Sequence, residues 1–244
     1  MILFHAVNFT AIPWDFTVIL LALATLIPWR GVVRIGRLMR RPDLSSTDRL
    51  SLYGSTIAGQ WLIAGIVSWR AFARGMSPQE LGLTIFEPWK SAWIAAVVTL
   101  LLAATQFAAM RMAVSIPAEQ RGSLFRITEK IMPRTSVDAV VYAALAATAG
   151  LSEEFLYRGF VFAVFLRMLA HTAAPAIYAA VISSAWFGAA HLYQGRRGLI
   201  TTFVVGLIFV AMRVYSGNLL PPIIAHVAID LTVGLCVPRL LRKA

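Results

Sequence analysis

The sequence has little charge, few acidic residues and one cysteine. Charged residues make up 14% of its 244 residues, whereas hydrophobic residues make up 59%. Soluble domains typically contain about 25% charged residues. The single cysteine, Cys236, excludes an internal disulfide and a cysteine-rich metal cluster. This composition is not that of an ordinary soluble domain, and it predicts a membrane protein.

The sequence also lacks a separate basic segment that could bind nucleic acid, although its net charge is +11. Arg and Lys collect in the cytoplasmic loops of membrane proteins, so we attribute this charge to topology and expect no nucleic-acid partner. The N-terminal stretch has no positively charged region and no small-residue cleavage site, and we expect no signal peptide. Since we find no repeat and no flexible linker, we predict that residues 1–244 form a single membrane domain.

Apolar segments follow one another along the whole chain. A helix needs about 20 mainly apolar residues to span a bilayer. The candidate segments are 12–29, 51–69, 91–114, 137–170, 175–193, 198–214 and 218–238. The fourth segment is too long for one straight span, so it either forms one tilted helix or breaks near Gly159 into two. We therefore predict an all-α fold, a polytopic membrane bundle of about seven to eight transmembrane helices.

The basic residues indicate which ends of the helices share a side of the membrane. With seven spans, loops 30–50 and 111–136, the turn 194–197 and the C-terminal tail lie on one side and carry sixteen Arg and Lys, against five on the other. Because basic residues favour the cytoplasm, we expect the C-terminus there and the N-terminus outside. We expect an integral protein of the bacterial inner membrane.

The segment 70–90 is the predicted excursion from the membrane. Its "SPQE" is typical of a helix start, with Ser77 as the N-cap, Pro78 at the first position and Glu80 at the third. We expect a short interfacial helix here.

Ionisable residues inside predicted spans indicate a functional site. The stretch "SEEFLYR" at 152–158 places Glu154 and Arg158 four residues apart, on one face of a helix, where they can pair. Glu153 is turned by about 100° from Glu154 and is left free for another role.

Two histidines follow in later spans. His226 and Asp230 are four residues apart, so the carboxylate can fix the tautomer of the imidazole. Phe187 and His191 share a face in the same way, and the ring of Phe187 is predicted to form a wall of a substrate site beside His191.

These residues resemble the motifs of the CAAX prenyl endopeptidase type II family, also called CPBP or ABI. "EEFLYR" is similar to the family's EExxxR, "FGAAH" to its FxxxH and "HVAID" to its HxxxN/D, in the same order. The short "ELGL" at 80–83 is similar to a weaker upstream signature. The resemblance covers about 139–235.

The resemblance implies an intramembrane endopeptidase of the CAAX protease or bacteriocin-processing type, with an active site that opens on the cytoplasmic side. It makes Glu153 the general base that activates water, supported by Glu154 and Arg158. His191 would position the water, while His226 and Asp230 would hold the oxyanion. Many relatives have Asn in place of Asp230, and an ionised aspartate cannot donate to an oxyanion. We therefore expect Asp230 to orient His226 instead. The expected substrate is a peptide or protein, including lipid-anchored or membrane-bound ones.

Two alternatives remain from the residues. His191, His226 and a carboxylate could hold zinc in a membrane metallopeptidase, although HExxH is missing from the sequence. A non-catalytic bacteriocin-immunity or scaffold protein is the second alternative. We expect no cofactor and no metal.

Overall fold

The computed structural model describes residues 12–117 and 120–241 of the chain. It contains helices and no strand within these residues. The elements are α1 (Trp14–Leu21), η2 (Ala22–Leu26), α2 (Ile27–Met39), α3 (Ser46–Ala73), α4 (Pro88–Val114), α5 (Ser123–Ile131), α6 (Ser136–Glu154), η4 (Phe155–Val161), α7 (Phe162–Met168), α8 (Pro175–Ala190), η5 (Leu192–Gln194), α9 (Gly195–Ser216) and α10 (Leu220–Leu241). The all-α prediction is confirmed.

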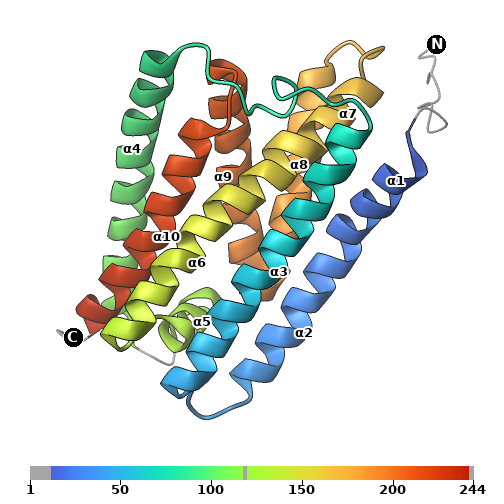
Figure 1. Ribbon diagram of the computed structural model, residues 1–244. Helices are drawn as coiled ribbons and strands as arrows, with labels where there is room; N and C mark the ends of the chain where they lie inside the picture. The colour runs from blue at the N-terminus through green and yellow to red at the C-terminus, as the bar shows by residue number, and fades with distance from the viewer. Residues whose placement is uncertain (1–11, 118–119, 242–244) are drawn as a thin grey trace, which may run out of the picture.

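Long apolar helices run up and down through the bundle (Figure 1). Five are long and apolar enough to cross a membrane: Trp14–Met39, Ser46–Ala73, Pro88–Val114, Ser136–Met168 and Leu192–Ser216. Two shorter apolar helices, Pro175–Ala190 and Leu220–Cys236, complete the bundle. These helices correspond to the seven apolar segments of the sequence, and the chain folds as a helical membrane bundle.

The predicted segment 137–170 forms one continuous helical run, Ser136–Met168, from α6 through η4 to α7, and it does not reverse near Gly159. The η4 part is a π-helix, whose wider turn leaves backbone carbonyls to other partners. Arg213 of α9 donates from Nε to the carbonyl of Arg158 at 2.9 Å and from Nη2 to the carbonyl of Glu80 at 2.6 Å. Side chains of η4 lie in the largest buried cluster, so the charged motif sits in the centre of the core.

The first helix is longer than the predicted span 12–29, because α2 continues it to Met39. Pro28 lacks the amide hydrogen that an α-helix would direct to a carbonyl one turn earlier. The π-helical turn η2 lies at that place and lets the helix continue. Part of the predicted loop 30–50 is therefore helical, and Arg30 and Arg34 lie on α2.

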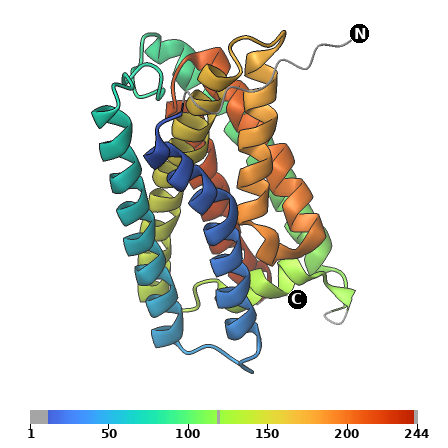
Figure 2. The same ribbon diagram turned by 90° about the vertical axis from the view of Figure 1, so that its right-hand side faces the viewer.

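The basic segments gather at one end of the bundle. The α2–α3 connection and α5 lie at the same end in both views (Figures 1 and 2), and Ser123 of α5 donates to the carbonyl of Gln194 at 3.1 Å. We call this the basic end. The C-terminal end of α10 lies there as well (Figure 1).

Helices α3 and α6 both start at the basic end, where capping residues and an ion pair stabilise them. Ser45 and Thr135 cap them, each in a capping box with the aspartate three residues later. Asp138 also accepts a hydrogen bond from Arg49 Nε at 3.0 Å, and both side chains are buried. This buried ion pair joins the two helices that carry the residues discussed below.

The interfacial helix predicted after Arg70 is not formed. Ser77 and Glu80 do make the predicted reciprocal hydrogen bonds, but the turn ends at Gly82, whose φ of +71° lies outside helical geometry. The Ser77 backbone amide holds the pKa of Glu80 below its ordinary value, and Arg167 adds to this effect. The segment therefore forms a folded turn, and the ion pair between Glu80 and Arg167 holds this turn against α7.

Candidate active site

The first motif lies at the junction of α6 and η4. Glu154 accepts a hydrogen bond from Arg158 Nη1 at 3.0 Å, and neither side chain is accessible to solvent. The predicted pairing of these residues is confirmed. The same oxygen, Oε1 of Glu154, lies 2.7 Å from Nδ1 of His226 on α10. Glu154 therefore joins two motifs that are far apart in the sequence.

The prediction that Asp230 fixes the tautomer of His226 is wrong. Nε2 of His226 is 3.8 Å from Oδ2 of Asp230, which is beyond hydrogen-bonding distance. Since the carboxylate of Glu154 is the partner of Nδ1, it is Glu154 that orients the imidazole. One helical turn separates His226 from Asp230, and the ring is turned toward the buried ion pair instead.

The ring of Phe187 contacts the rings of both histidines. Its ring centroid is 4.8 Å from that of His191 and 5.9 Å from that of His226. The guanidinium of Arg158 lies 3.9 Å from the same centroid, in cation–π contact. Phe187 is 3% exposed and does not line the pocket described below. Its observed contacts thus stabilise Arg158 and support the imidazoles, and its role in binding substrate stays a prediction.

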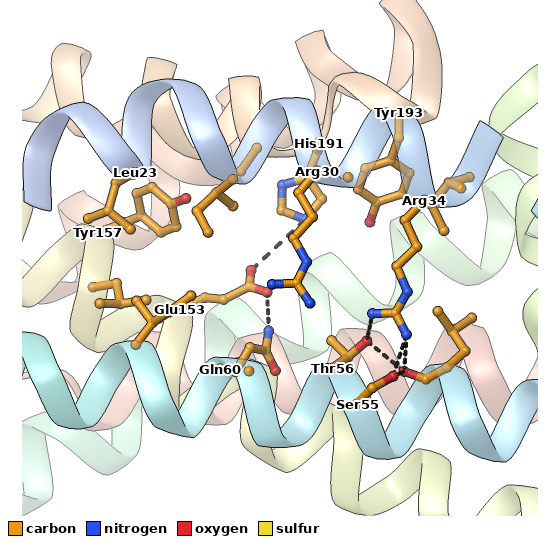
Figure 3. Close-up of a pocket in the computed structure, with 18 residues that line it drawn as sticks. Leu23, Arg30, Arg34, Ser55, Thr56, Gln60, Glu153, Tyr157, His191 and Tyr193 are labelled. Atoms are coloured by element: carbon orange, nitrogen blue, oxygen red, sulfur yellow. Dashed lines mark hydrogen bonds and ion pairs between the residues drawn. The ribbon is translucent and has the colours of Figure 1, made fainter. Parts of the chain in front are cut away.

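Glu153 points away from the buried ion pair and toward α3. Its Oε1 accepts a hydrogen bond of 2.7 Å from Nε2 of Gln60 (Figure 3). Its Oε2 lies 3.9 Å from Nε2 of His191 and has no hydrogen-bond partner within the described part of the chain. The structure therefore brings Glu153 and His191 together, as the motifs predicted, and adds Gln60.

The tautomer of His191 follows from its other ring nitrogen. Nδ1 lies 2.8 Å from the carbonyl oxygen of Phe187. A carbonyl can only accept, so Nδ1 of His191 carries a hydrogen, and Nε2 is an acceptor whenever the ring is uncharged. Two acceptors, Oε2 of Glu153 and Nε2 of His191, thus face each other. A small molecule with two donor hydrogens, such as water, satisfies both.

These atoms lie at a pocket of about 220 Å³ between α2, α3, η4 and the segment 190–193. Figure 3 shows Arg30 and Arg34 reaching into it from α2 and Gln60 from α3. Glu153 and His191 line the pocket, whereas His226 and Asp230 do not. Of the four site residues Glu153, His191, His226 and Asp230, two therefore line this pocket. His226 reaches the others through Glu154 and Phe187.

Sequence reasoning missed Gln60, Arg30 and Arg34 as neighbours of the site. The two arginines were assigned to a loop because the first helix was ended too early. Gln60 had one signal: it is an uncharged amide in the middle of a predicted span, where a polar group needs a partner.

No group of three or more His, Cys, Asp and Glu side chains in the described residues is arranged to hold a metal ion. Glu153 and His191 meet, but Nδ1 of His226 is hydrogen-bonded to Glu154 and His226 is not among the residues that line the pocket.

Comparison with known proteins agrees with this part of the chain. Residues 135–232 match the family described as "Type II CAAX prenyl endopeptidase Rce1-like". The matched range contains all three motifs and leaves out α1 to α5. Searches of curated proteins and of solved structures gave no match. The resemblance drawn from the three motifs is therefore confirmed: residues 135–232 of this chain match a family of peptidases, the type II CAAX prenyl endopeptidase Rce1-like family.

Proposed function

We propose that this protein is an intramembrane endopeptidase in which Glu153 activates a water molecule directly. The observation that carries the proposal is the pair of facing acceptors, Oε2 of Glu153 and Nε2 of His191, 3.9 Å apart at the pocket. A water between them gives one hydrogen to each. Its lone pair is then free to attack the carbonyl carbon of a peptide bond in the pocket.

The atoms balance without a covalent enzyme intermediate. Glu153 takes one proton from the water as its oxygen bonds to the carbonyl carbon. The resulting oxyanion needs a donor. Nδ1 of His226 is held by Glu154, so a protonated His226 would direct its Nε2 hydrogen to the oxyanion, with Asp230 nearby. Glu153 then gives its proton to the leaving amine as the C–N bond breaks.

Glu154 and Arg158 have a supporting role in this scheme. Both are inaccessible to solvent and neither lines the pocket, so neither contacts the substrate. Their buried pair fixes His226 on one side, and Glu153, the adjacent residue, is directed to the other. We also propose that the reaction requires no metal. Zinc held by His191, His226 and a carboxylate is the alternative that the experiments below exclude or establish.

We propose that the substrate is a peptide or protein presented at the membrane, including lipid-anchored ones. We further propose that the basic end faces the cytoplasm of a bacterial cell, so that the C-terminus is cytoplasmic and the membrane is the inner one. The gathering of basic segments at one end of the bundle supports this orientation.

The test is cleavage by the purified protein in liposomes. Two fluorescent peptides with the same C-A-A-X end are used, one farnesylated and one unmodified, together with a mixture of unrelated peptides. Wild-type protein should cleave at least one of them, and Glu153→Gln should reduce the rate by a factor of about 10² or more. A fully active Glu153→Gln variant, or no cleavage of any peptide by folded wild-type protein, would overturn the proposal.

A further inference from the structure

Gln60 lies outside the segment that matches the peptidase family, yet it contacts the proposed base. It sits near the middle of α3 and donates to Oε1 of Glu153 at 2.7 Å, across 93 positions of sequence. Both side chains line the pocket. The proposed base is therefore held by a helix that the family match does not include.

The hydrogen bond determines which way the amide points. A carboxylate can only accept, so the NH₂ group of Gln60 must face Glu153. Its carbonyl oxygen, Oε1, consequently points away from Glu153 (Figure 3), and it is buried without a hydrogen-bond partner. A buried acceptor without a donor costs about 1–3 kcal/mol, which a donor arriving in the pocket would offset.

The helices do not need this contact in order to pack. Arg49 and Asp138 already join α3 to α6 at the basic end. Trp61 also donates to Thr148 of α6 at 3.2 Å. A structural tie is thus present on both sides of Gln60, and a pairing of two apolar residues would have packed the same helices. The amide of Gln60 does something that an apolar side chain could not. It occupies Oε1 of Glu153 and leaves only Oε2 free.

On this basis, and resting on the proposed function, we propose that Gln60 is both a positioning residue and part of the substrate subsite. Its amide nitrogen holds Oε1 of Glu153 so that Oε2 faces His191 and the water between them. Its Oε1 accepts a hydrogen bond from a backbone N–H of the bound peptide. A peptide that enters the pocket loses water at its N–H groups, and this acceptor replaces one such contact.

The two parts of the proposal separate in steady-state kinetics. The assay uses whichever of the liposome peptides the wild-type protein cleaves, with rates expressed per mole of folded protein. Gln60→Leu removes donor and acceptor, so kcat should fall by about 10–100-fold from misplacement of the base. KM should rise by about 5-fold from the lost hydrogen bond. Gln60→Glu keeps acceptor oxygens but puts a second carboxyl group beside Glu153, where the two share a proton and the base is impaired, so kcat should fall with little change in KM.

Two further variants keep the interpretation clear. Gln106→Leu, in the apolar helix α4 and away from the pocket, is the matched control and should retain the wild-type kcat and KM. Gln60→Asn keeps the amide but is one methylene too short to reach Glu153, so it should lose kcat like Gln60→Leu. It replaces Gln60→Leu if the latter does not fold.

Failure of this inference is distinct from failure of the proposed function. If Glu153→Gln is inactive while Gln60→Leu and Gln60→Asn keep kcat within about twofold of wild type, Gln60 has no positioning role. If their activity falls only as the melting temperature and folded fraction fall, the contact is structural. If Glu153→Gln itself is active, both proposals fail together.

Discussion

Replacing Glu154 with glutamine tests the buried centre of the site. Oε1 of Glu154 is the common partner of Arg158 Nη1 and His226 Nδ1. Glutamine keeps the shape and an acceptor oxygen but removes the charge. Arg158 then stays in the core without a counter-charge on this residue, and its Nε and Nη2 already lack hydrogen-bond partners among the described residues. Its contacts with Phe187 and Phe209 remain.

Breaking a buried ion pair by removing one partner costs about 3–5 kcal/mol. At roughly 2–4 °C per kcal/mol for a chain of this size, the melting temperature should fall by about 6–20 °C. The assay is thermal unfolding in detergent, followed by tryptophan fluorescence, together with the abundance of the protein in membranes. Both should fall for Glu154→Gln.

Glu153→Gln is the matched control, because it makes the same substitution at the adjacent residue. Gln60 can still donate to the new amide oxygen, so stability should stay near that of the wild type while activity is lost. If the two variants melt within about 2 °C of each other and of the wild type, then the pair of Glu154 and Arg158 does not stabilise the core, and the distinct roles assigned to the two glutamates are refuted.

Three further results are expected. Reporter fusions after positions 45 and 125 should both indicate the cytoplasm and a fusion near position 80 the opposite side; disagreement between the first two would contradict the gathering of basic segments at one membrane face. Protein purified without chelator should contain no stoichiometric zinc by elemental analysis and should keep its activity after chelation, whereas activity lost with a zinc ion and restored by it would establish the metal mechanism. Asp138→Asn, which weakens the buried contact with Arg49, should lower the melting temperature without changing kcat per folded molecule, and a selective loss of kcat would place this pair in the catalytic machinery.

The apolar pattern of the sequence was sufficient to predict the bundle. Helices that must cross a bilayer require long apolar segments, and each segment predicted from this rule became a helix. The ends were less predictable. The arginines after residue 29 were assigned to a loop, because hydropathy does not record that a helix can continue past the apolar run or that arginines on it can line a pocket.

The candidate site was predictable as far as its contacts lie within one helical turn. The pairing of Glu154 with Arg158 follows from their spacing alone. The partner of His226 could not be predicted from spacing. Asp230 has the same spacing, but Glu154 on another helix is closer, and this depends on how the helices pack. The local pattern marked Gln60 only as a polar group within a span; its partner could not be predicted, since the contact with Glu153 depends on how α3 lies against α6.

The π-helical turn at Phe155–Val161 also affects how this chain must be compared with others. A π-turn holds one more residue than an α-turn, so deleting a single residue here would restore an ordinary α-helix while leaving α6 through Glu154 in place. Everything from α7 onward would then keep its rotation about the helix axis, whereas the same deletion in an ordinary helix would rotate it by about 100°. A relative without this wide turn should therefore align to the present chain with a one-residue gap inside Phe155–Val161 and with its flanking helices in the same register. In this stretch a gap in an alignment records the width of a helix and not the loss of a loop.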